Sequence, residues 1–181
     1  MLNGITLAIG IIIILLFSSL ILTLLISAFL VPLFKTPKEI LEEVVNIMNL
    51  QKTDTFVDLG SGDGRLVLEA YEQSQCKCIG YDISPIMMIM ANTSRILRFP
   101  FAKEILFIPE DIFKVDISNA TKVYCYLNDK TLSILGQKLI NYIEKGGVLF
   151  SYKNQIKGLG KEKMVVLSND VPLYIYGRRG E

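Results

Sequence analysis

Beyond residue 35, the pattern of apolar and polar positions has first a helical period and then a strand period. Apolar residues recur every three or four positions between residues 40 and 48, which predicts a helix with one buried face. Its start is predicted at Thr36, because a threonine N-cap followed by Pro37 and Glu39 is typical of the first turn of a helix. Further helices are expected over residues 66–70, 84–97 and 130–143.

Short apolar runs separate these helical segments and predict strands. The runs cover residues 56–59, 78–82, 105–108, 123–127 and 148–152. Strands and helices that alternate at these lengths predict a doubly wound α/β fold with a mostly parallel sheet. The last two runs, residues 164–167 and 173–176, have only a turn-forming stretch between them. We therefore expect a closing antiparallel pair and a sheet of seven strands.

The first 34 residues contain no charged side chain, and residues 5–33 are almost entirely apolar. About 20 such residues form a helix that spans the hydrocarbon core of a bilayer. A cleaved signal peptide is the alternative, but no Lys or Arg precedes the run, the run is long, and no small-x-small cleavage site follows it. We predict a transmembrane helix over residues 1–34 and a single soluble domain over residues 35–181.

Basic residues and cysteines indicate on which side of the membrane this domain lies. Lys35 and Lys38 follow the apolar run, so the positive-inside tendency places the domain in the cytoplasm. Cys76, Cys78 and Cys125 are an odd number without the spacing of a disulfide framework, which argues against secretion. Cys76 and Cys78 alternate within an apolar segment, so we interpret them as strand residues rather than metal ligands.

Two features of the composition exclude classes of function. The chain contains no histidine, so a histidine general base, a serine–histidine triad and a histidine-containing zinc site are all excluded. Its 19 basic and 18 acidic residues give a formal net charge of +1 and are mixed along the soluble part. This is not the basic footprint of a nucleic-acid-binding domain, and we expect no nucleic-acid partner.

Glycines and acidic residues stand at three successive predicted strand ends, where an open parallel sheet binds its ligands. The first group, residues 58–65, reads Asp-Leu-Gly-Ser-Gly-Asp-Gly-Arg. Its glycines permit positive φ angles and close approach of a ligand, and the next helix offers amide donors at its N-terminus. A plain turn and a dinucleotide fingerprint are the alternatives, but the fingerprint requires G-x-G-x-x-G, whereas this motif is G-x-G-x-G preceded by Asp58.

The second and third strand ends each add a carboxylate. Asp82 follows Gly64 by 18 residues and can accept hydrogen bonds from both hydroxyls of a ribose. Glu110, Asp111 and Ile112 end the third strand, where a carboxylate and an apolar side chain can contact the amino group and the face of an adenine. The three groups in this order predict a site for a cofactor that contains a nucleoside.

This ordered set resembles the Rossmann-like class I methyltransferases, whose D/E-x-G-x-G-x-G motif and downstream acidic residues bind S-adenosylmethionine. Within that class the chain is similar to the archaeal protein-lysine methyltransferases and their eukaryotic mitochondrial relatives. The similarity extends over residues 36–177 and rests on residues 36–37, 57–65, 116–120, 126–128, 145–147, 152, 156–158 and 173–176. The mitochondrial members also have an apolar N-terminal segment, so their layout is the more similar one.

The resemblance implies S-adenosylmethionine as the cofactor and assigns its ligands to matching positions of this chain. The implied ligands are Thr36, Asp58, Gly60, Ser61, Gly62, Asp63, Gly64, Asp82, Ile83, Glu110, Asp111 and Ile112. Two residues depart from the family pattern, because Ser61 stands where cysteine is usual and Leu159 where a tryptophan often follows the glycine. Neither departure removes a cofactor ligand, but the second leaves the substrate loop after the fifth strand undefined.

Methyl transfer is an in-line attack on a sulfonium carbon by a neutral nucleophile, so the protein supplies position and a desolvated site, and no metal is needed. Related enzymes bring the substrate to the end of the fourth strand, which makes Tyr126, Asn128 and Asp129 the candidate catalytic residues. Tyr126 could instead only pack, and Asp129 only cap the next helix. The expected function is methylation of protein lysines at or near a membrane. The alternatives are methylation of a lipid, quinone or other small molecule, and a non-catalytic cofactor-binding membrane protein.

Overall fold

The computed structural model describes residues 4–30, 40–160 and 163–177. It divides the chain into two compact units, Met1–Leu33 and Phe34–Glu181. The first unit contains helix α1, Gly4–Leu30, whose Thr6–Thr23 segment is apolar and long enough to cross a membrane. No part of that segment is buried inside the protein. By length and composition, α1 could therefore span a bilayer.

The described part of the second unit begins with a helix whose apolar face packs on the sheet. This helix, α2 (Leu41–Met48), buries four of its eight residues and ends at Asn49, which has a left-handed φ angle of 45°. Such a residue satisfies the carbonyls at a helix end. The helix start predicted at Thr36 lies outside the described residues.

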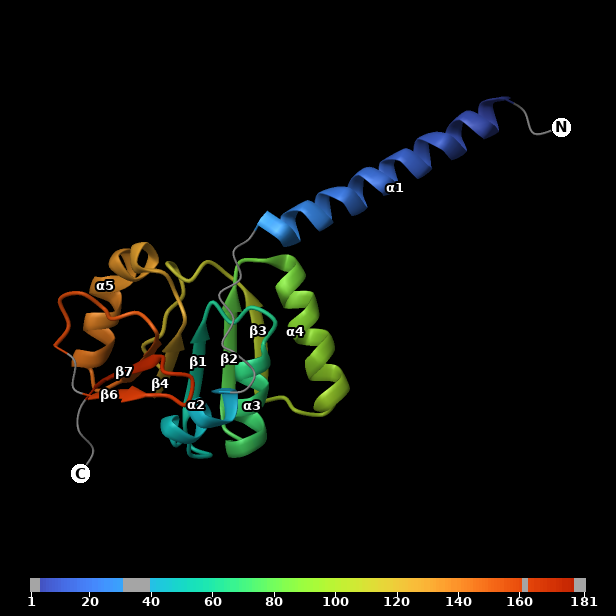
Figure 1. Cartoon of the computed structure of the whole chain (residues 1–181). Coiled ribbons are helices and arrows are strands. Elements are labelled where there is room, and N and C mark those ends of the chain that lie inside the picture. Colours follow the sequence, from blue (N-terminus) through green and yellow to red (C-terminus); the bar gives the residue numbers. More distant parts are fainter. Residues whose placement is uncertain (1–3, 31–39, 161–162, 178–181) are drawn as a thin grey trace. The chain divides into compact units, whose positions relative to one another are not determined.

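A seven-stranded sheet forms the centre of this unit (Figure 1). Its strand order is β3-β2-β1-β4-β5-β7-β6. Strands β1 to β5 are parallel, and β7 runs antiparallel to both β5 and β6. This confirms the predicted Rossmann-like sheet with its antiparallel C-terminal strand. The strands are β1 (Thr55–Leu59), β2 (Lys77–Asp82), β3 (Ile105–Pro109), β4 (Lys122–Cys125), β5 (Val148–Tyr152), β6 (Lys163–Val166) and β7 (Pro172–Tyr176).

Helices cover both faces of the sheet, because alternate residues of each central strand point to opposite faces. Phe56 and Tyr124 pack with α2, α3 (Arg65–Ser74) and α4 (Pro85–Arg98) on one face. Val57 and Val123 pack with α5 (Asp129–Glu144) on the other face. Figure 1 shows α5 on the side of the sheet where β4 and β7 lie, and α4 beside the edge strand β3. Helix α4 starts as predicted, since the Ser84 hydroxyl accepts a hydrogen bond from the Met87 amide.

One strand is shorter than predicted. We expected the fourth strand to reach residue 127, but β4 ends at Cys125. The reason is that side chains take over its backbone partners: the Asn154 side chain donates to the Leu127 carbonyl at 2.8 Å, and Asn128 caps α5. The next residues, 126–128, thus form a short extended connection at the carboxyl edge of the sheet.

The strand order reverses at β1, which lies between β2 and β4. In open α/β sheets, such a switch point leaves a crevice beyond the carboxyl ends of the strands, where ligands bind. The residues that follow β1, β2, β3 and β4 therefore form the candidate site.

Candidate functional site

The glycine loop after β1, residues 60–64, turns the chain from the strand into α3. Gly60, Gly62 and Gly64 have φ angles of 85°, 54° and 77°, a left-handed conformation that favours glycine. The amides of Gly60 and Ser61 donate to the Tyr81 carbonyl at 2.8 and 2.9 Å, which ties the loop to β2. These backbone angles explain why glycine recurs at every second position of the motif.

Two of these glycines have different surroundings. A Cβ at Gly64 would lie 2.5 Å from the Phe107 ring and 2.9 Å from the Cβ of Ala91, so this glycine permits close packing of the loop on the core. A Cβ at Gly62 would meet no atom within 4 Å. Gly62 is therefore a point at which the backbone of the loop is open to a ligand.

Asp82 ends β2 and orders the segments on both sides of it. Its Oδ2 accepts a hydrogen bond from the Gly62 amide at 3.0 Å, and its Oδ1 accepts one from the Ser84 amide at 2.8 Å. Each carboxylate oxygen has a further lone pair, so the group can also accept hydrogen bonds from two hydroxyls. Ile83, the next residue, is 71% exposed. The two residues together present a carboxylate and an apolar side chain at the carboxyl edge.

The polar side chains of the glycine loop differ in their hydrogen bonding. The Ser61 hydroxyl is buried and, among the described residues, has no hydrogen-bond partner. An unsatisfied buried polar group costs about 1–3 kcal/mol, so a polar ligand atom that reached it would be stabilising. Asp63 instead pairs with Arg65, whose Nη2 and Nε lie 2.7 and 3.1 Å from its two oxygens.

The loop after β3 accepts a hydrogen bond from a lysine of helix α5. Asp111 Oδ1 accepts a hydrogen bond from the Phe113 amide at 3.0 Å, and Glu110 is exposed. Lys138 of α5 donates from Nζ to the Ile112 carbonyl at 2.9 Å. Partial burial lowers the pKa of Lys138 although neighbouring carboxylates oppose that shift. Sequence reasoning missed Lys138, because a helical lysine has no local signal that separates it from a solvated one.

The candidate catalytic residues lie directly after β4. The Tyr126 ring packs edge-on against Tyr152, with ring centroids 4.7 Å apart. Asn128 Oδ1 accepts a hydrogen bond from the Thr131 amide at 2.9 Å, so Asn128 rather than Asp129 is the N-cap of α5. Asp129 stands in the first turn, where a negative charge complements the helix dipole. The catalytic roles of these three residues stay predictions.

A tight turn after β5 completes this edge. Lys153 has a φ angle of 70°, and the Asn154 amide donates to the Tyr152 carbonyl at 2.9 Å, which forms a γ-turn with positive φ. The Asn154 side chain then donates to the Leu127 carbonyl, and the Asn154 carbonyl accepts from the Ser151 hydroxyl at 2.6 Å. Strained turns of this kind gather at functional sites. Sequence reasoning missed Asn154, for which the only signal was a Lys-Asn pair after a buried strand.

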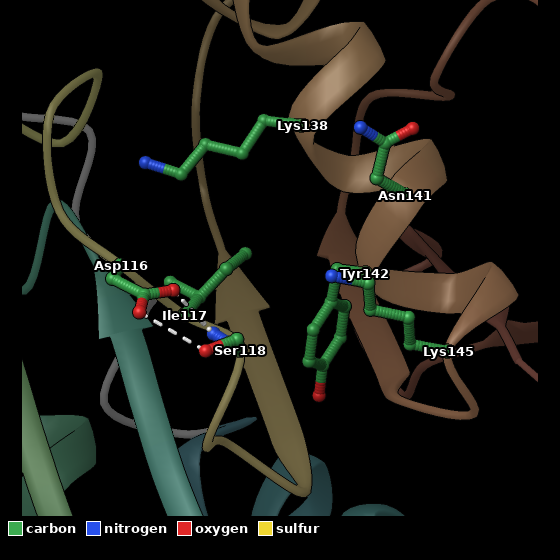
Figure 2. Close-up of a pocket in the computed structure, with 7 residues that line it drawn as sticks. All are labelled: Asp116, Ile117, Ser118, Lys138, Asn141, Tyr142 and Lys145. Carbon is green, nitrogen blue, oxygen red and sulfur yellow. Dashed lines mark hydrogen bonds between the residues drawn. The ribbon is translucent and has the colours of Figure 1, made fainter.

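One predicted ligand and one surface pocket lie apart from the site described above. Thr36, the remaining predicted cofactor ligand, lies outside the described residues. A surface pocket of about 370 Å³ lies between α5 and the segment before β4, and none of the predicted cofactor ligands lines it (Figure 2). Its lining residues are Asp116, Ile117, Ser118, Lys138, Asn141, Tyr142 and Lys145.

Comparison with known protein families identifies the domain. A family model described as the ANTKMT methyltransferase domain matches residues 58–163, more than half of the chain. The chain belongs to this family. Its membership confirms the resemblance to methyltransferases that the strand-end motifs predicted.

Individual relatives extend over most of the methyltransferase domain. A protein-lysine N-methyltransferase of Saccharolobus islandicus is 26% identical over 155 residues, which are 81% of this chain and 94% of that protein. An adenine nucleotide translocase lysine N-methyltransferase of Mus musculus is 29% identical over 99 residues, or 54% of this chain and 43% of that protein. The crystal structure of an RNA methyltransferase from Salinibacter ruber with S-adenosyl-L-homocysteine matches with a TM-score of 0.71 and 27% identity, covering 78% and 92% of the two chains.

The chain is therefore an S-adenosylmethionine-dependent methyltransferase. The geometry of the carboxyl edge fits this cofactor in three respects. The backbone at Gly62 is open, Asp82 retains acceptor capacity for a ribose, and the buried Ser61 hydroxyl lacks a partner among the described residues. The N-terminus of α3 follows directly and offers amides to an anionic group. The assignment of individual ligands remains a prediction.

Asp58, near the end of β1, is only 3% exposed. Its pKa is raised well above the ordinary value, first by burial and then by the negative charges of Asp82 and Asp63. Because its folded-state pKa lies above the unfolded one, Asp58 contributes stability at low pH that is lost as the pH rises through the raised pKa. A cation bound nearby would favour the ionised carboxylate.

We expect cofactor binding to release a proton from Asp58, since S-adenosylmethionine carries sulfonium and ammonium charges. Affinity should then increase as the pH rises toward the raised pKa of Asp58. Calorimetric titrations in two buffers with different ionisation enthalpies measure the released proton. The Asp58→Asn variant, which cannot ionise, should show no such release. A binding enthalpy that is independent of the buffer in the unmodified protein would contradict this assignment.

Proposed function

We propose that this methyltransferase modifies lysine side chains of proteins that lie in or beside a membrane. The observation that carries the proposal is its match to an archaeal protein-lysine N-methyltransferase along nearly the whole length of that protein. The mouse relative supports the same chemistry by name. The domain would extend over residues 35–181 and be anchored by residues 1–34.

The Salinibacter ruber relative is named as an RNA methyltransferase, so RNA is the second candidate substrate. Binding of a nucleic acid backbone depends on clustered positive charge. This chain has 19 basic and 18 acidic residues, and α3 and α5 each carry both signs. The charge balance supports a protein substrate over RNA.

Bound S-adenosylmethionine would supply a methyl group activated by the sulfonium sulfur. We propose that the cofactor binds at the carboxyl edge. Its ligands would be Asp58, the glycine loop, Asp82 and residues 110–112. Gly62 would allow close approach of the cofactor, and Asp82 would accept the ribose hydroxyls. Lys138 would position residues 110–112 through the Ile112 carbonyl.

The lysine that accepts the methyl group must first lose a proton to solvent. At pH 7 this costs about 4–5 kcal/mol for a reference pKa of about 10.4. An apolar wall at the reaction site would lower that cost, because burial disfavours the ammonium form. The edge-on pair of Tyr126 and Tyr152 supports such a role. The lone pair of the neutral amine would then form the new N–C bond as the S–C bond of the bound cofactor breaks, leaving a methylated ammonium group and S-adenosylhomocysteine.

Asn128 and Asp129, which follow this connection, have different roles in the proposal. Asn128 Oδ1 is occupied by the Thr131 amide, so we assign Asn128 a positioning role at the start of α5. Asp129 lies one residue further and would accept a hydrogen bond from the incoming ammonium group. The Asn154 side chain, which donates to the Leu127 carbonyl, would hold in place the connection between β4 and these two residues.

The membrane part of the proposal rests on the composition of α1. Its Thr6–Thr23 segment has the length and hydropathy of a bilayer span. Lys35 and Lys38 follow it in sequence, which supports a cytoplasmic position of the domain. Protease added to intact cells should therefore leave the domain uncut, and digestion without lysis would contradict this orientation.

Product analysis tests the proposed substrate. The full chain, reconstituted in vesicles, is incubated with methyl-labelled S-adenosylmethionine and membranes of the host. Acid hydrolysis followed by amino-acid analysis should recover the label as methylated lysine. The Gly62→Arg variant serves as the inactive control. Label recovered in RNA or in the lipid extract, with none in lysine, would contradict protein methylation.

A further inference from the structure

Helix α4 exposes an apolar face to solvent. Ile89, Met90, Ile96 and Leu97 are all exposed, and Leu97 is 78% exposed. Met90, Ile96 and Leu97 follow Ile89 by one, seven and eight positions, and Thr93 follows it by four, which places all five on one side of an α-helix. We call Ile89, Met90, Thr93, Ile96 and Leu97 the α4 stripe.

The opposite side of the same helix is buried in the domain core. Met87, Met88 and Ala91 are buried, and Met88 and Ala91 pack against the sheet. A surface helix normally places charged residues on the side opposite its core-facing side. On α4 that side carries four apolar residues and one threonine, so the stripe is not required by the fold of the domain. Contiguous apolar surface of this kind marks an interaction site.

The apolar surface continues past the end of the helix. Phe101, three residues after Arg98, is 92% exposed, and Leu106 of the edge strand β3 is also exposed. Because β3 is the last strand on its side of the sheet, no further strand among the described residues pairs with this edge.

The charges near the stripe indicate what covers it. Helix α4 contains two basic residues, Arg95 and Arg98, both in its last turn, and no acidic residue. Arg98 is partly neutralised by Glu72, while Lys103 adds an exposed cation beyond the helix. Both arginines follow the buried Ala91 at helical spacing, so they lie toward the domain, and Arg95 donates to the Ala102 carbonyl at 3.3 Å. A helix that combines an exposed apolar face with basic residues on its other side and no acidic residue is typical of the interface of a membrane with anionic lipids.

The sequence places a bilayer within reach of this surface. Only nine residues, 31–39, lie between Leu30, the end of α1, and Ile40. Even fully extended, a segment of this length spans at most about 35 Å. If α1 spans a membrane, as the proposed function holds, the domain must remain close to the headgroups of that membrane.

We propose that the α4 stripe lies in the interface of the bilayer in which α1 is anchored. Helix α4 follows Asp82 by three residues, so this contact would also set the angle between the membrane and the carboxyl edge that binds the cofactor. The inference rests on the proposed membrane anchor. A covering protein, including a second copy of this chain, is the competing occupant.

Single tryptophans can test this contact, because the chain contains none. Leu97→Trp reports on the α4 stripe, and Phe17→Trp reports on α1. Ile134→Trp is the matched control, since Ile134 is an apolar residue of α5 with 62% exposure. Each full-length variant is reconstituted in vesicles of anionic and neutral lipids whose acyl chains carry bromine, a quencher of tryptophan fluorescence. Unchanged cofactor affinity verifies that each variant is folded.

We expect the Phe17→Trp and Leu97→Trp variants to lose most of their emission and the Ile134→Trp control to keep its emission. If position 17 is quenched and position 97 is not, the stripe proposal is overturned while the anchor stands. If neither is quenched, both are overturned, whereas quenching at 97 alone supports a lipid contact without an anchor. Shielding of position 97 from aqueous iodide without quenching by brominated lipid would identify a protein as the occupant, and would also overturn the proposal.

Discussion

Replacing Gly62 with arginine is expected to lower the affinity for S-adenosylmethionine at least about 100-fold, or about 2.7 kcal/mol, and to lower the free energy of unfolding by only about 1–2 kcal/mol. A Cβ at Gly62 would meet no atom within 4 Å, so the core does not resist the change. Its φ angle of 54° adds a cost of about 1–2 kcal/mol. The new side chain would fill the space that the cofactor needs and would add a charge beside its cationic groups. Calorimetry and thermal unfolding measure the two effects separately.

Two other glycines provide controls for this variant. Gly64→Ala should lower the free energy of unfolding by about 2–4 kcal/mol, because its Cβ would overlap the Phe107 ring and Ala91 at a φ angle of 77°. Gly136→Arg adds the same charge on α5, where a Cβ meets no neighbour. It should leave cofactor affinity unchanged. An affinity loss in the Gly136 variant equal to that of Gly62→Arg would mean that charge, and not the open backbone at Gly62, explains the effect.

Arginines placed within α1 are expected to remove the protein from the membrane without affecting its cofactor site. Ile13 and Leu16 lie in the centre of the Thr6–Thr23 segment, and both are exposed. On insertion scales each replacement by arginine costs about 3 kcal/mol, so the double variant loses about 6 kcal/mol, or roughly 10⁴-fold in insertion. In the proposed function, an anchor would raise the effective concentration of membrane-bound substrates. We therefore expect lysine methylation in host membranes to fall at least about tenfold.

The measurements for the double variant are membrane flotation, cofactor affinity, and methylation of host membranes and of a soluble lysine peptide. Cofactor affinity and methylation of the peptide should match those of the unmodified chain, because α1 contributes no residue to the carboxyl edge as described. Ile13→Val with Leu16→Val is the matched apolar control and should float with the vesicles. Undiminished methylation of membrane proteins by the arginine variant would show that proximity is not the purpose of α1, and the substrate should then be sought in the cytosol.

Most of the sheet could be predicted because its signals are local. Short apolar runs of strand length, glycine after β1 and the Ser84 cap of α4 are all readable within a few positions of the chain. The order of acidic residues at successive strand ends likewise pointed to one ligand, because parallel strands bring their carboxyl ends to the same edge. The family and its cofactor were then implied by the resemblance of this ordered motif set to the class I methyltransferases.

The errors and omissions share a different cause, which is contact between residues far apart in the chain. β4 ends at Cys125 because a side chain 27 positions beyond Leu127 takes the Leu127 carbonyl. Lys138 could not be linked to the loop at Ile112, 26 positions before it, until α5 was placed on the sheet. Asn128 and Asp129 are adjacent and both suit a helix cap, and only the backbone geometry assigns the cap to Asn128.

The apolar N-terminal helix and the order of strands and helices were predictable because they depend on local periodicity, and the cofactor was implied by the family resemblance that a few short motifs carry. Only the tertiary structure decided which glycine faces open space and which faces the Phe107 ring. It alone also showed that Asp58 is buried near two further carboxylates and that α4 leaves an apolar stripe uncovered. These properties depend on which surfaces the folded chain brings together, and a helical pattern in sequence does not tell which of two apolar faces the sheet will bury.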